Sequence, residues 1–320
     1  MKKIFITGGT GTVGKAFIGK YYNDYIFYSF ARNEKQQVSL KRTFPKIEII
    51  MGGVENYAHL QTEISKVSPD IIIHAAALTQ VPKAEYDPFV YIKTNIIGAQ
   101  NLIECCLDKN VSNVIALSTD KAVSPINLYG ATKLCSDKLF LSANNIVGDK
   151  KIKFSVVRYG NVNGSRGSVI PVFLKQQKTG KLSITDPNMT RFSMDIEEAC
   201  EMVLWSIKNN LGGEIFIPKL PSYRILDLAK AIDNNSKIKI TGIRPGEKIS
   251  EELITSSESL NCYDMGKYYV MVGVNNPKIK KFYSSRFDKV DKNFNYNSSN
   301  NKNFLNLNKL KKIINKIKIN

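Results

Sequence analysis

The sequence predicts an α/β protein built on a doubly wound parallel sheet, with a smaller C-terminal α/β part. The segments expected to be strands are apolar throughout, as parallel strands covered on both faces are, and lie at 3–7, 25–30, 47–51, 70–77 and 113–118. Segments of helical periodicity alternate with them, at about 12–21, 56–67 and 86–108. A glycine-rich turn joins the first strand to the first helix, where such sheets bind their ligands.

The chain changes character after Gly160. A helix at about 127–142 and a strand at 153–159 still continue the alternation. Beyond them, polar motifs separate helices at about 195–209 and 225–233 from short strands at 213–217 and 237–241. We therefore expect a first part over 1–160, a smaller part over 161–275 that interleaves with it, and a basic segment over 276–320.

Charge is concentrated at the C-terminus. The 320-residue chain has a formal net charge of +18, and residues 277–320 hold 12 Lys plus Arg against 2 Asp. A nucleic-acid arm is one interpretation of this segment, but no module of interleaved aromatic and basic residues accompanies it. We expect a solvated, Asn- and Lys-rich tail with one short final helix, and no nucleic-acid partner.

Composition also limits the chemistry. The hydrophobic fraction of 43% supports a sizeable core. The five cysteines form no CxxC pair and there are two histidines, so no metal site is predicted. No apolar run reaches the length of about 18 residues that spans a membrane, and the apolar run at the N-terminus is too short for a signal peptide. We expect a cytoplasmic protein without stable membrane insertion.

The first turn, ITGGTGTVG, has the GxxGxxG spacing of a dinucleotide-binding site. Glycines there allow the backbone to approach a pyrophosphate, and the following helix supplies N–H donors. The residues expected to bind the cofactor are Gly8, Thr10, Gly11, Thr12, Val13, Gly14, Gly53, Val54, Ala75 and Ala76, together with Tyr129 and Lys133 further along the chain.

The end of the second strand discriminates between the two nicotinamide cofactors. It reads SFARNEK, and Arg32, Asn33 and Lys35 suit the 2′-phosphate of NADP. Glu34 leaves NAD open as the less favoured alternative.

The stretch STDKAVSPINLYGATK carries the candidate catalytic residues. Thr119, Asp120 and Lys121 follow the fifth strand, at the sheet edge that faces the ligand. Tyr129 and Lys133 are four residues apart on the next helix and share one face. A tyrosine beside an ammonium and a cationic nicotinamide can take a proton from a hydroxyl while hydride leaves the same carbon.

These motifs resemble the extended short-chain dehydrogenase/reductase superfamily. STDKAVSPINLYGATKLCSDKLF, RYGNVNGSRGSVIP, MTRF, GGEIFIPK and IRPGEK together are similar to one family within it, the inverting UDP-N-acetylglucosamine 4,6-dehydratases. The resemblance implies a Rossmann fold, a homo-oligomer, and production of UDP-2-acetamido-2,6-dideoxy-β-L-arabino-hex-4-ulose for pseudaminic acid on surface glycans such as flagellin. It also implies a substrate site made of Asn161, Arg166, Gly167, Ser168, Thr190, Arg191, Arg244 and Glu247.

The resemblance assigns roles to the Asp-Lys pair. Oxidation at C4 acidifies the C5 proton, Lys121 removes it, Asp120 protonates the departing C6 hydroxyl, and the reduced cofactor returns hydride to C6. Lys121 then needs a lowered pKa, which we expect Lys133 and the nicotinamide charge to provide.

Three motifs depart from the family's pattern. Thr79 and Gln80 replace a lysine and a histidine, Gly53 replaces an aspartate, and Ser193 replaces a tryptophan. The alternatives left open are a retaining 4,6-dehydratase, a 4-epimerase on a related UDP-sugar, and a non-catalytic NADP-binding protein. The Asp-Lys pair argues against the epimerase, which expels no water.

Overall fold

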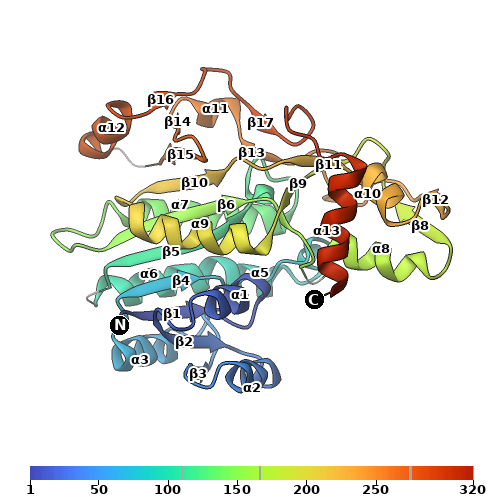
Figure 1. Cartoon of the computed structure of the whole chain (residues 1–320). Helices are drawn as coiled ribbons and strands as arrows, with labels where there is room; N and C mark the ends of the chain where they lie inside the picture. The colour runs from blue at the N-terminus through green and yellow to red at the C-terminus, as the bar shows by residue number, and fades with distance from the viewer. Residues whose placement is uncertain (110, 166, 274–275, 320) are drawn as a thin grey trace.

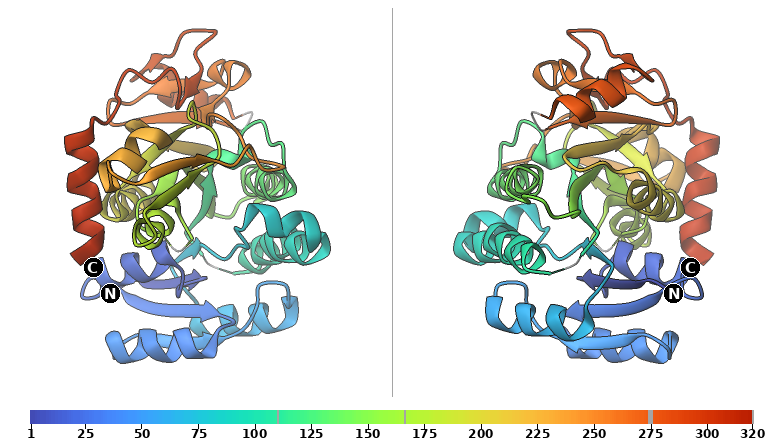
Figure 2. Two further views of the ribbon diagram at one scale, coloured as in Figure 1. Left: turned by 90° about the vertical axis from the view of Figure 1, so that its right-hand side faces the viewer. Right: turned by 90° about the vertical axis from the view of Figure 1, so that its left-hand side faces the viewer.

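The computed structural model describes residues 1–109, 111–165, 167–273 and 276–319. In this part of the chain one ten-stranded sheet runs through the molecule, and helices lie on both sides of it (Figures 1 and 2). Its strands are β1 (Lys3–Thr7), β2 (Ile26–Ala31), β3 (Glu48–Met51), β4 (Ile71–His74), β5 (Asn113–Thr119), β6 (Lys153–Tyr159), β10 (Glu214–Pro218), β14 (Cys262–Asp264), β15 (Tyr268–Val272) and β16 (Asp288–Lys289).

The helices of the described chain connect and cover these strands. They are α1 (Thr12–Lys20), α2 (Glu34–Thr43), α3 (Tyr57–Val67), α4 (Val81–Tyr86), α5 (Pro88–Ile92), the π-helical turn η1 (Lys93–Ile97), α6 (Gly98–Leu107), the 3₁₀ turn η2 (Asp120–Ala122), α7 (Leu128–Ala143), α8 (Val169–Gln177), α9 (Ile196–Asn209), α10 (Ile225–Ile232), α11 (Ser256–Ser259), α12 (Pro277–Ser284) and α13 (Leu307–Ile319).

Short strands outside the main sheet complete the structure. They form the sets β7 (Asn161–Val162), β9 (Thr190–Met194) and β11 (Ser222–Arg224); β8 (Lys181–Ile184) and β12 (Lys237–Ile240); and β13 (Glu252–Ile254) and β17 (Tyr296–Asn297).

The strand order of the main sheet is β16-β14-β15-β10-β6-β5-β4-β1-β2-β3. Pairing is parallel from β10 to β3 and antiparallel from β10 outward to β16. This confirms the predicted doubly wound parallel sheet. Because parallel strands end at one edge, β1, β4 and β5 bring their carboxyl ends together, and that edge holds the candidate site.

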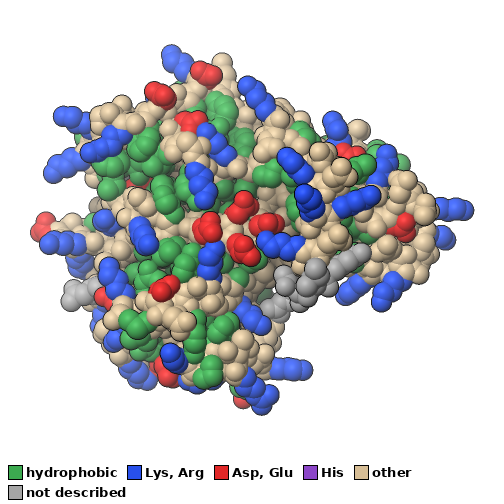
Figure 3. Space-filling view, viewed as in Figure 1, with side chains coloured by type: hydrophobic (Ala, Val, Ile, Leu, Met, Phe, Trp, Pro, Cys, Tyr) green, Lys and Arg blue, Asp and Glu red, His purple; other side chains and the backbone are tan. Residues whose placement is uncertain are grey.

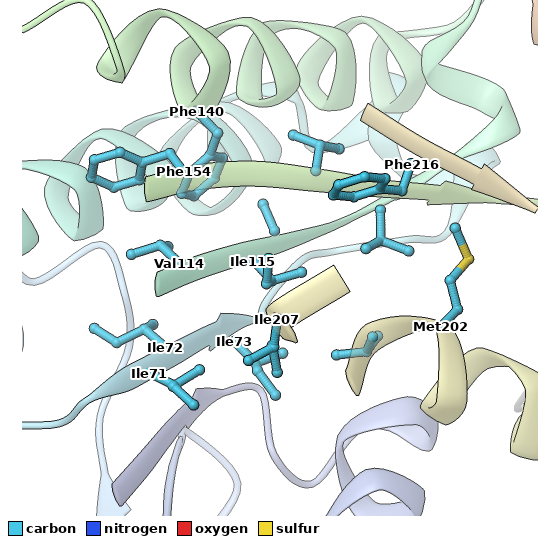
Figure 4. Close-up of a cluster of buried hydrophobic side chains, with 14 of the residues drawn as sticks. Ile71, Ile72, Ile73, Val114, Ile115, Phe140, Phe154, Met202, Ile207 and Phe216 are labelled. Atoms are coloured by element: carbon cyan, nitrogen blue, oxygen red, sulfur yellow. The ribbon is translucent and has the colours of Figure 1, made fainter. Parts of the chain in front are cut away.

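The core is packed from both faces of the sheet. The helices α3, α6 and α7 lie beside one another on one face, and α1 and α9 on the other. Figure 4 shows Ile72 and Ile115 of the sheet between Phe140 of α7 and Met202 and Ile207 of α9. The strands are apolar on both sides for this reason.

Most predicted elements are confirmed within one or two residues, and three differ. The strand expected at 70–77 ends at His74, and the next three alanines line a cleft. The helix expected at 86–108 begins at Pro88 and contains the turn η1. The strand expected at 213–217 in the smaller part is β10, which pairs in parallel with β6 of the main sheet.

The prediction of a solvated tail is wrong. Leu310 and Ile314 of α13 are 1% and 2% exposed and belong to a second hydrophobic cluster with α8 and α10. Tyr296 in β17 is also buried, and β17 pairs with β13. The apolar positions of α13 recur at helical spacing, so one face packs while the lysines stay on the other.

The surface carries both basic and acidic side chains, and the basic ones are more widespread. Lys and Arg side chains are spread over the face in Figure 3, and acidic side chains gather near its centre, over α9. Lys316 of α13 lies 3.5 Å from Asp195 and 3.6 Å from Glu197, so this acidic group helps to hold the C-terminal helix. None of the helices in the described part of the chain has the length and apolar composition that a membrane crossing requires.

Candidate active site

The glycine turn after β1 is built for close backbone approach. Gly8 has φ of +72°, and a Cβ at that position would lie 2.8 Å from backbone atoms of Ala75 and Ala76. A Cβ on Gly14 would lie 2.8 Å from the Cα of Gly9, so α1 packs directly on the turn. Gly11 is the N-cap of α1 and provides no side-chain cap, which leaves the first-turn N–H groups, including those of Thr12 and Val13, for an anion.

A cleft opens beside this turn. It is lined by residues at the ends of four strands, by Gln36 of α2 and by Thr94 of η1. The residues at the strand ends are Gly8, Thr10, Gly11, Phe30, Ala31, Arg32, Asn33, Gly52, Gly53, Val54, Glu55, Ala75, Ala76 and Ala77. The glycines, the uncapped helix and the extended cleft fit a dinucleotide. The predicted cofactor residues that lie outside this lining are Thr12, Val13, Gly14, Lys35, Tyr129 and Lys133. Lys35 is exposed on α2.

Arg32 and Glu55 face each other at the adenosine end of the cleft. Arg32 Nη1 lies 3.6 Å from Glu55 Oε1. The carboxyl group of Glu55 lies over Gly53, so that a Cβ on Gly53 would be 2.2 Å from Oε1. A carboxylate therefore occupies the space that the family's aspartate side chain would need. The Asn33 side chain caps α2 by accepting from the backbone N–H of Gln36.

The carboxyl end of β5 carries the Asp-Lys pair. Lys121 Nζ donates to Asp120 Oδ1 at 3.0 Å and lies 3.2 Å from Glu251 Oε1. The Thr119 hydroxyl also donates to Asp120 Oδ1, at 2.9 Å. Asp120 is fully buried, and its Oδ2 has no hydrogen-bond partner among the described residues.

Burial raises the pKa of Asp120, with Lys121 opposing the rise and Glu251 adding to it. A buried carboxylate oxygen without a partner is unfavourable when charged, so this environment makes Asp120 easier to protonate than an exposed aspartate. For Lys121, burial lowers the pKa, but the carboxylates of Asp120 and Glu251 outweigh burial and raise it above its ordinary value. The predicted lowering of the Lys121 pKa is therefore wrong for the chain alone, because the nearest charges are negative.

Tyr129 and Lys133 lie on α7, which packs tightly on η2. A Cβ on Gly130 would lie 2.2 Å from the carbonyl oxygen of Lys121. Burial raises the Tyr129 pKa to about 12, while Lys121 and a hydrogen bond with Thr119 oppose the rise. The neighbouring ammonium is thus Lys121. Lys133 donates to the carbonyl oxygen of Leu117 at 2.9 Å, and burial lowers its pKa.

Asn95 connects the cleft to the catalytic helix. Its side chain accepts from the N–H of Leu78, donates to the Leu78 carbonyl, and donates to Thr132 Oγ1 at 3.0 Å. Asn95 follows Thr94, which lines the cleft, and Thr132 precedes Lys133. The π-helical turn η1 places both contacts on one side chain, as such turns at functional sites do.

The predicted substrate residues fall into two groups. Asn161 Oδ1 and Ser168 Oγ are buried polar atoms without hydrogen-bond partners in the described ranges, as expected for atoms that await a ligand. Gly167 has φ of +76°, and Arg166 lies outside the described residues. Thr190 instead hydrogen-bonds to Ser298 of the C-terminal segment, at 2.8 Å.

The charged residues of the predicted substrate site form a row of ion pairs in which cations and carboxylates alternate. Arg244 Nη2 lies 2.8 Å from Glu247 Oε1, and Arg191 Nη2 lies 3.8 Å from the same oxygen. Arg191 Nε then lies 3.5 Å from Glu251, which contacts Lys121. Both arginines of the predicted substrate site are thus paired with carboxylates in the described chain.

The structure shows the exposure and the hydrogen bonds of the other residues that depart from the family pattern. Thr79 and Gln80 are exposed, and the Gln80 carbonyl accepts from Tyr91 at 2.7 Å. Ser193 is buried and exchanges hydrogen bonds with the amide of Asn163, at 2.9 and 3.2 Å.

Sequence reasoning missed Glu55, Lys248 and Glu251. Lys248 donates to the carbonyl oxygen of Val123 at 2.7 Å and ties the IRPGEK loop to the catalytic turn. Lys248 lies within that motif and could have been found from it. Glu251 lies just beyond the motif, and its role depends on a contact with a residue 130 positions earlier.

Comparison with known proteins gives the family. The polysaccharide biosynthesis protein family matches residues 4–273. A UDP-N-acetylglucosamine 4,6-dehydratase (inverting) of Campylobacter jejuni is 45% identical, over 94% of this chain and 93% of that protein. A UDP-glucose 4-epimerase of Rickettsia akari is 37% identical, over 98% of this chain and 95% of that protein.

A solved structure, that of Pen from Bacillus thuringiensis, superposes with a TM-score of 0.90. It is 32% identical and covers 100% of this chain and 98% of its own. The chain therefore belongs to the polysaccharide biosynthesis protein family, with the extended short-chain dehydrogenase/reductase fold and a resemblance to the inverting UDP-N-acetylglucosamine 4,6-dehydratases.

Proposed function

We propose that the protein is an NADP-dependent, 5-inverting UDP-N-acetylglucosamine 4,6-dehydratase. The observation that carries the proposal is the contact between Asp120 and Lys121 at the carboxyl end of β5, beside Tyr129. Elimination of water needs a base at C5 and an acid at the C6 hydroxyl, and this pair supplies both. The similarity to the Campylobacter dehydratase supports the same reaction.

Each side chain has a distinct role in the proposed reaction. A bound nicotinamide cofactor supplies hydride acceptance at C4 and hydride return at C6. Tyr129 accepts the C4 hydroxyl proton, and the nearby ammonium of Lys121 stabilises its phenolate. Lys121 removes the C5 proton, and Asp120 protonates the leaving hydroxyl. When hydride returns to C6, a proton that originates from solvent reaches C5 on the opposite face, which inverts C5 and completes the loss of one water.

The pair reaches its working form by moving one proton. Lys121 Nζ donates to Asp120 Oδ1, so transfer along this hydrogen bond leaves a neutral amine and a neutral carboxyl group. No proton is gained or lost in that step. Burial by itself favours the neutral pair because it penalises both charges, whereas the carboxylate of Glu251 favours the ammonium form of Lys121.

The experiment is incubation with UDP-N-acetylglucosamine in deuterated water. We expect a 4-keto-6-deoxy sugar with one deuterium at C5, and no accumulation of reduced cofactor. Lys121→Met should lower the rate by about 10²-fold or more. Lys138→Met, which removes an exposed lysine of α7, is the matched control and should keep the rate of the unmodified protein. Return of intact substrate from the unmodified protein would contradict the proposal.

For the cofactor, NADP is favoured by Arg32 at the adenosine end of the cleft. Arg32→Met should weaken NADP binding by about tenfold, as expected for one lost charged contact of about 1.4 kcal/mol, and leave NAD binding nearly unchanged. Arg42→Met removes an exposed arginine of α2 and serves as control. Equal weakening of both cofactors would favour NAD as the natural one.

A UDP-sugar 4-epimerase is the second candidate, supported by the similarity to the Rickettsia protein. An epimerase would return a 4-epimer without deuterium at C5, so the same incubation separates the two. The domain limits, cytoplasmic location, homo-oligomeric assembly and supply of pseudaminic acid for flagellin remain predictions.

A further inference from the structure

One buried carboxylate beside the catalytic pair has no role in the reaction as described so far. Glu251 is 2% exposed, and its Oε1 lies 3.2 Å from Lys121 Nζ. Lys121 therefore bridges two carboxylates, since Asp120 Oδ1 lies 3.0 Å from the same nitrogen. A carboxylate is seldom found at this depth unless cations hold it there.

The position of Glu251 is set by the backbone. Its N–H donates to Ser298 Oγ at 2.9 Å, and its carbonyl accepts from the Ser298 N–H at 2.8 Å. The C-terminal segment thus holds Glu251 against the catalytic turn. Oε2 of Glu251 has no hydrogen-bond partner within the described chain, so the side chain is directed by its ion pairs alone.

The charges that face Glu251 come from separate elements. Lys121 lies on η2, Arg191 on β9 has its Nε 3.5 Å from Glu251 Oε1, and the ammonium of Lys248 lies nearby. These cations lower the pKa of Glu251 despite its burial. Asp120 is the facing acid, and its pKa is raised in part by Glu251. The surrounding cations therefore favour the anionic form of Glu251.

We propose that Glu251 is a positioning residue that controls how protons are distributed between Lys121 and Asp120. This rests on the proposed dehydration, in which Lys121 must give up a proton and then accept one from C5. Glu251 stabilises the ammonium that forms when Lys121 accepts the C5 proton, as the carboxylate of a serine-protease triad does for its imidazolium. The same carboxylate moves formation of the neutral amine to higher pH.

The first test measures Lys121 directly and needs no activity. Lysine labelled with ¹³C at Cε is followed by NMR against pH, with the Lys121 signal assigned from Lys121→Arg. In Glu251→Gln the titration midpoint should fall by about 1–3 pH units, because one neighbouring negative charge is lost. Glu252→Gln is the control, since Glu252 contacts Ser124 and should leave the midpoint unchanged. An unchanged midpoint in Glu251→Gln would overturn the proposal.

The second test is the pH profile of dehydration. Removal of the Glu251 charge lowers the pKa of both Lys121 and Asp120. The rate rises with pH as Lys121 loses its proton and falls as Asp120 loses its proton, so both limbs of the profile should move to lower pH in Glu251→Gln. Glu251→Asp keeps the charge and should restore the original limbs at least in part. A uniform loss of rate with unmoved limbs would show a merely structural role. If the unmodified protein dehydrates nothing, the proposed function fails, while the NMR titration still decides the role of Glu251.

Discussion

Replacement of Gly8 by alanine tests the reasoning about the glycine turn. Gly8 has φ of +72°, and a left-handed conformation costs alanine about 1–2 kcal/mol relative to glycine. The added Cβ would also lie 2.8 Å from the Ala75 and Ala76 backbone, and such overpacking costs about 1–3 kcal/mol. We therefore expect a loss of about 2–5 kcal/mol in the free energy of unfolding, together with weakened nicotinamide cofactor binding.

The comparison with Gly180→Ala separates the two effects. Gly180 has φ of +65°, but a Cβ there would meet nothing within 4 Å. The entropy change of the unfolded chain is the same in both variants and cancels. With an unfolding entropy of about 2.1 cal/mol/K per residue, the 320 residues give shifts of about 3–7 °C for Gly8→Ala and about 1–3 °C for Gly180→Ala. Equal shifts in calorimetry would refute the close approach of Gly8 to the loop after β4.

Three further predictions concern other parts of the molecule. Tyr129→Phe should lower kcat by about 10²–10⁴-fold and change the unfolding free energy by only about 1 kcal/mol, as steady-state kinetics and thermal unfolding can check. Burial and Lys133 lower the His74 pKa to about 3, so the unfolded state binds a proton that the folded state excludes below pH 6.5. Stability should therefore fall by about 1.4 kcal/mol per pH unit from this group as pH drops from 6.5, and His74→Gln should remove that slope in denaturant titrations. Leu310→Ala should lower the free energy of unfolding by about 2–5 kcal/mol, as measured in urea. A change near zero would instead support the original prediction that the C-terminal segment is solvated.

The parallel sheet and the site's main residues could be predicted because local signals specify them. Apolar strands, the GxxGxxG turn and the Tyr129–Lys133 spacing each depend on residues within a few positions of one another. Contacts across the chain could not be predicted in this way. The pairing of β10 with β6, the burial of Leu310 and the contact of Lys121 with Glu251 each join segments with no shared local pattern.

The pKa of Lys121 shows most clearly what the sequence alone does not determine. The sequence by itself determined which residues follow β5 and the first strand, and therefore the class of chemistry, because chain order places those residues at one sheet edge. Only the tertiary structure decided the direction in which the pKa of Lys121 shifts. A pKa depends on every charge within a few ångströms, and Glu251 reaches Lys121 only when β9, the IRPGEK loop and the C-terminal segment have packed around the catalytic turn.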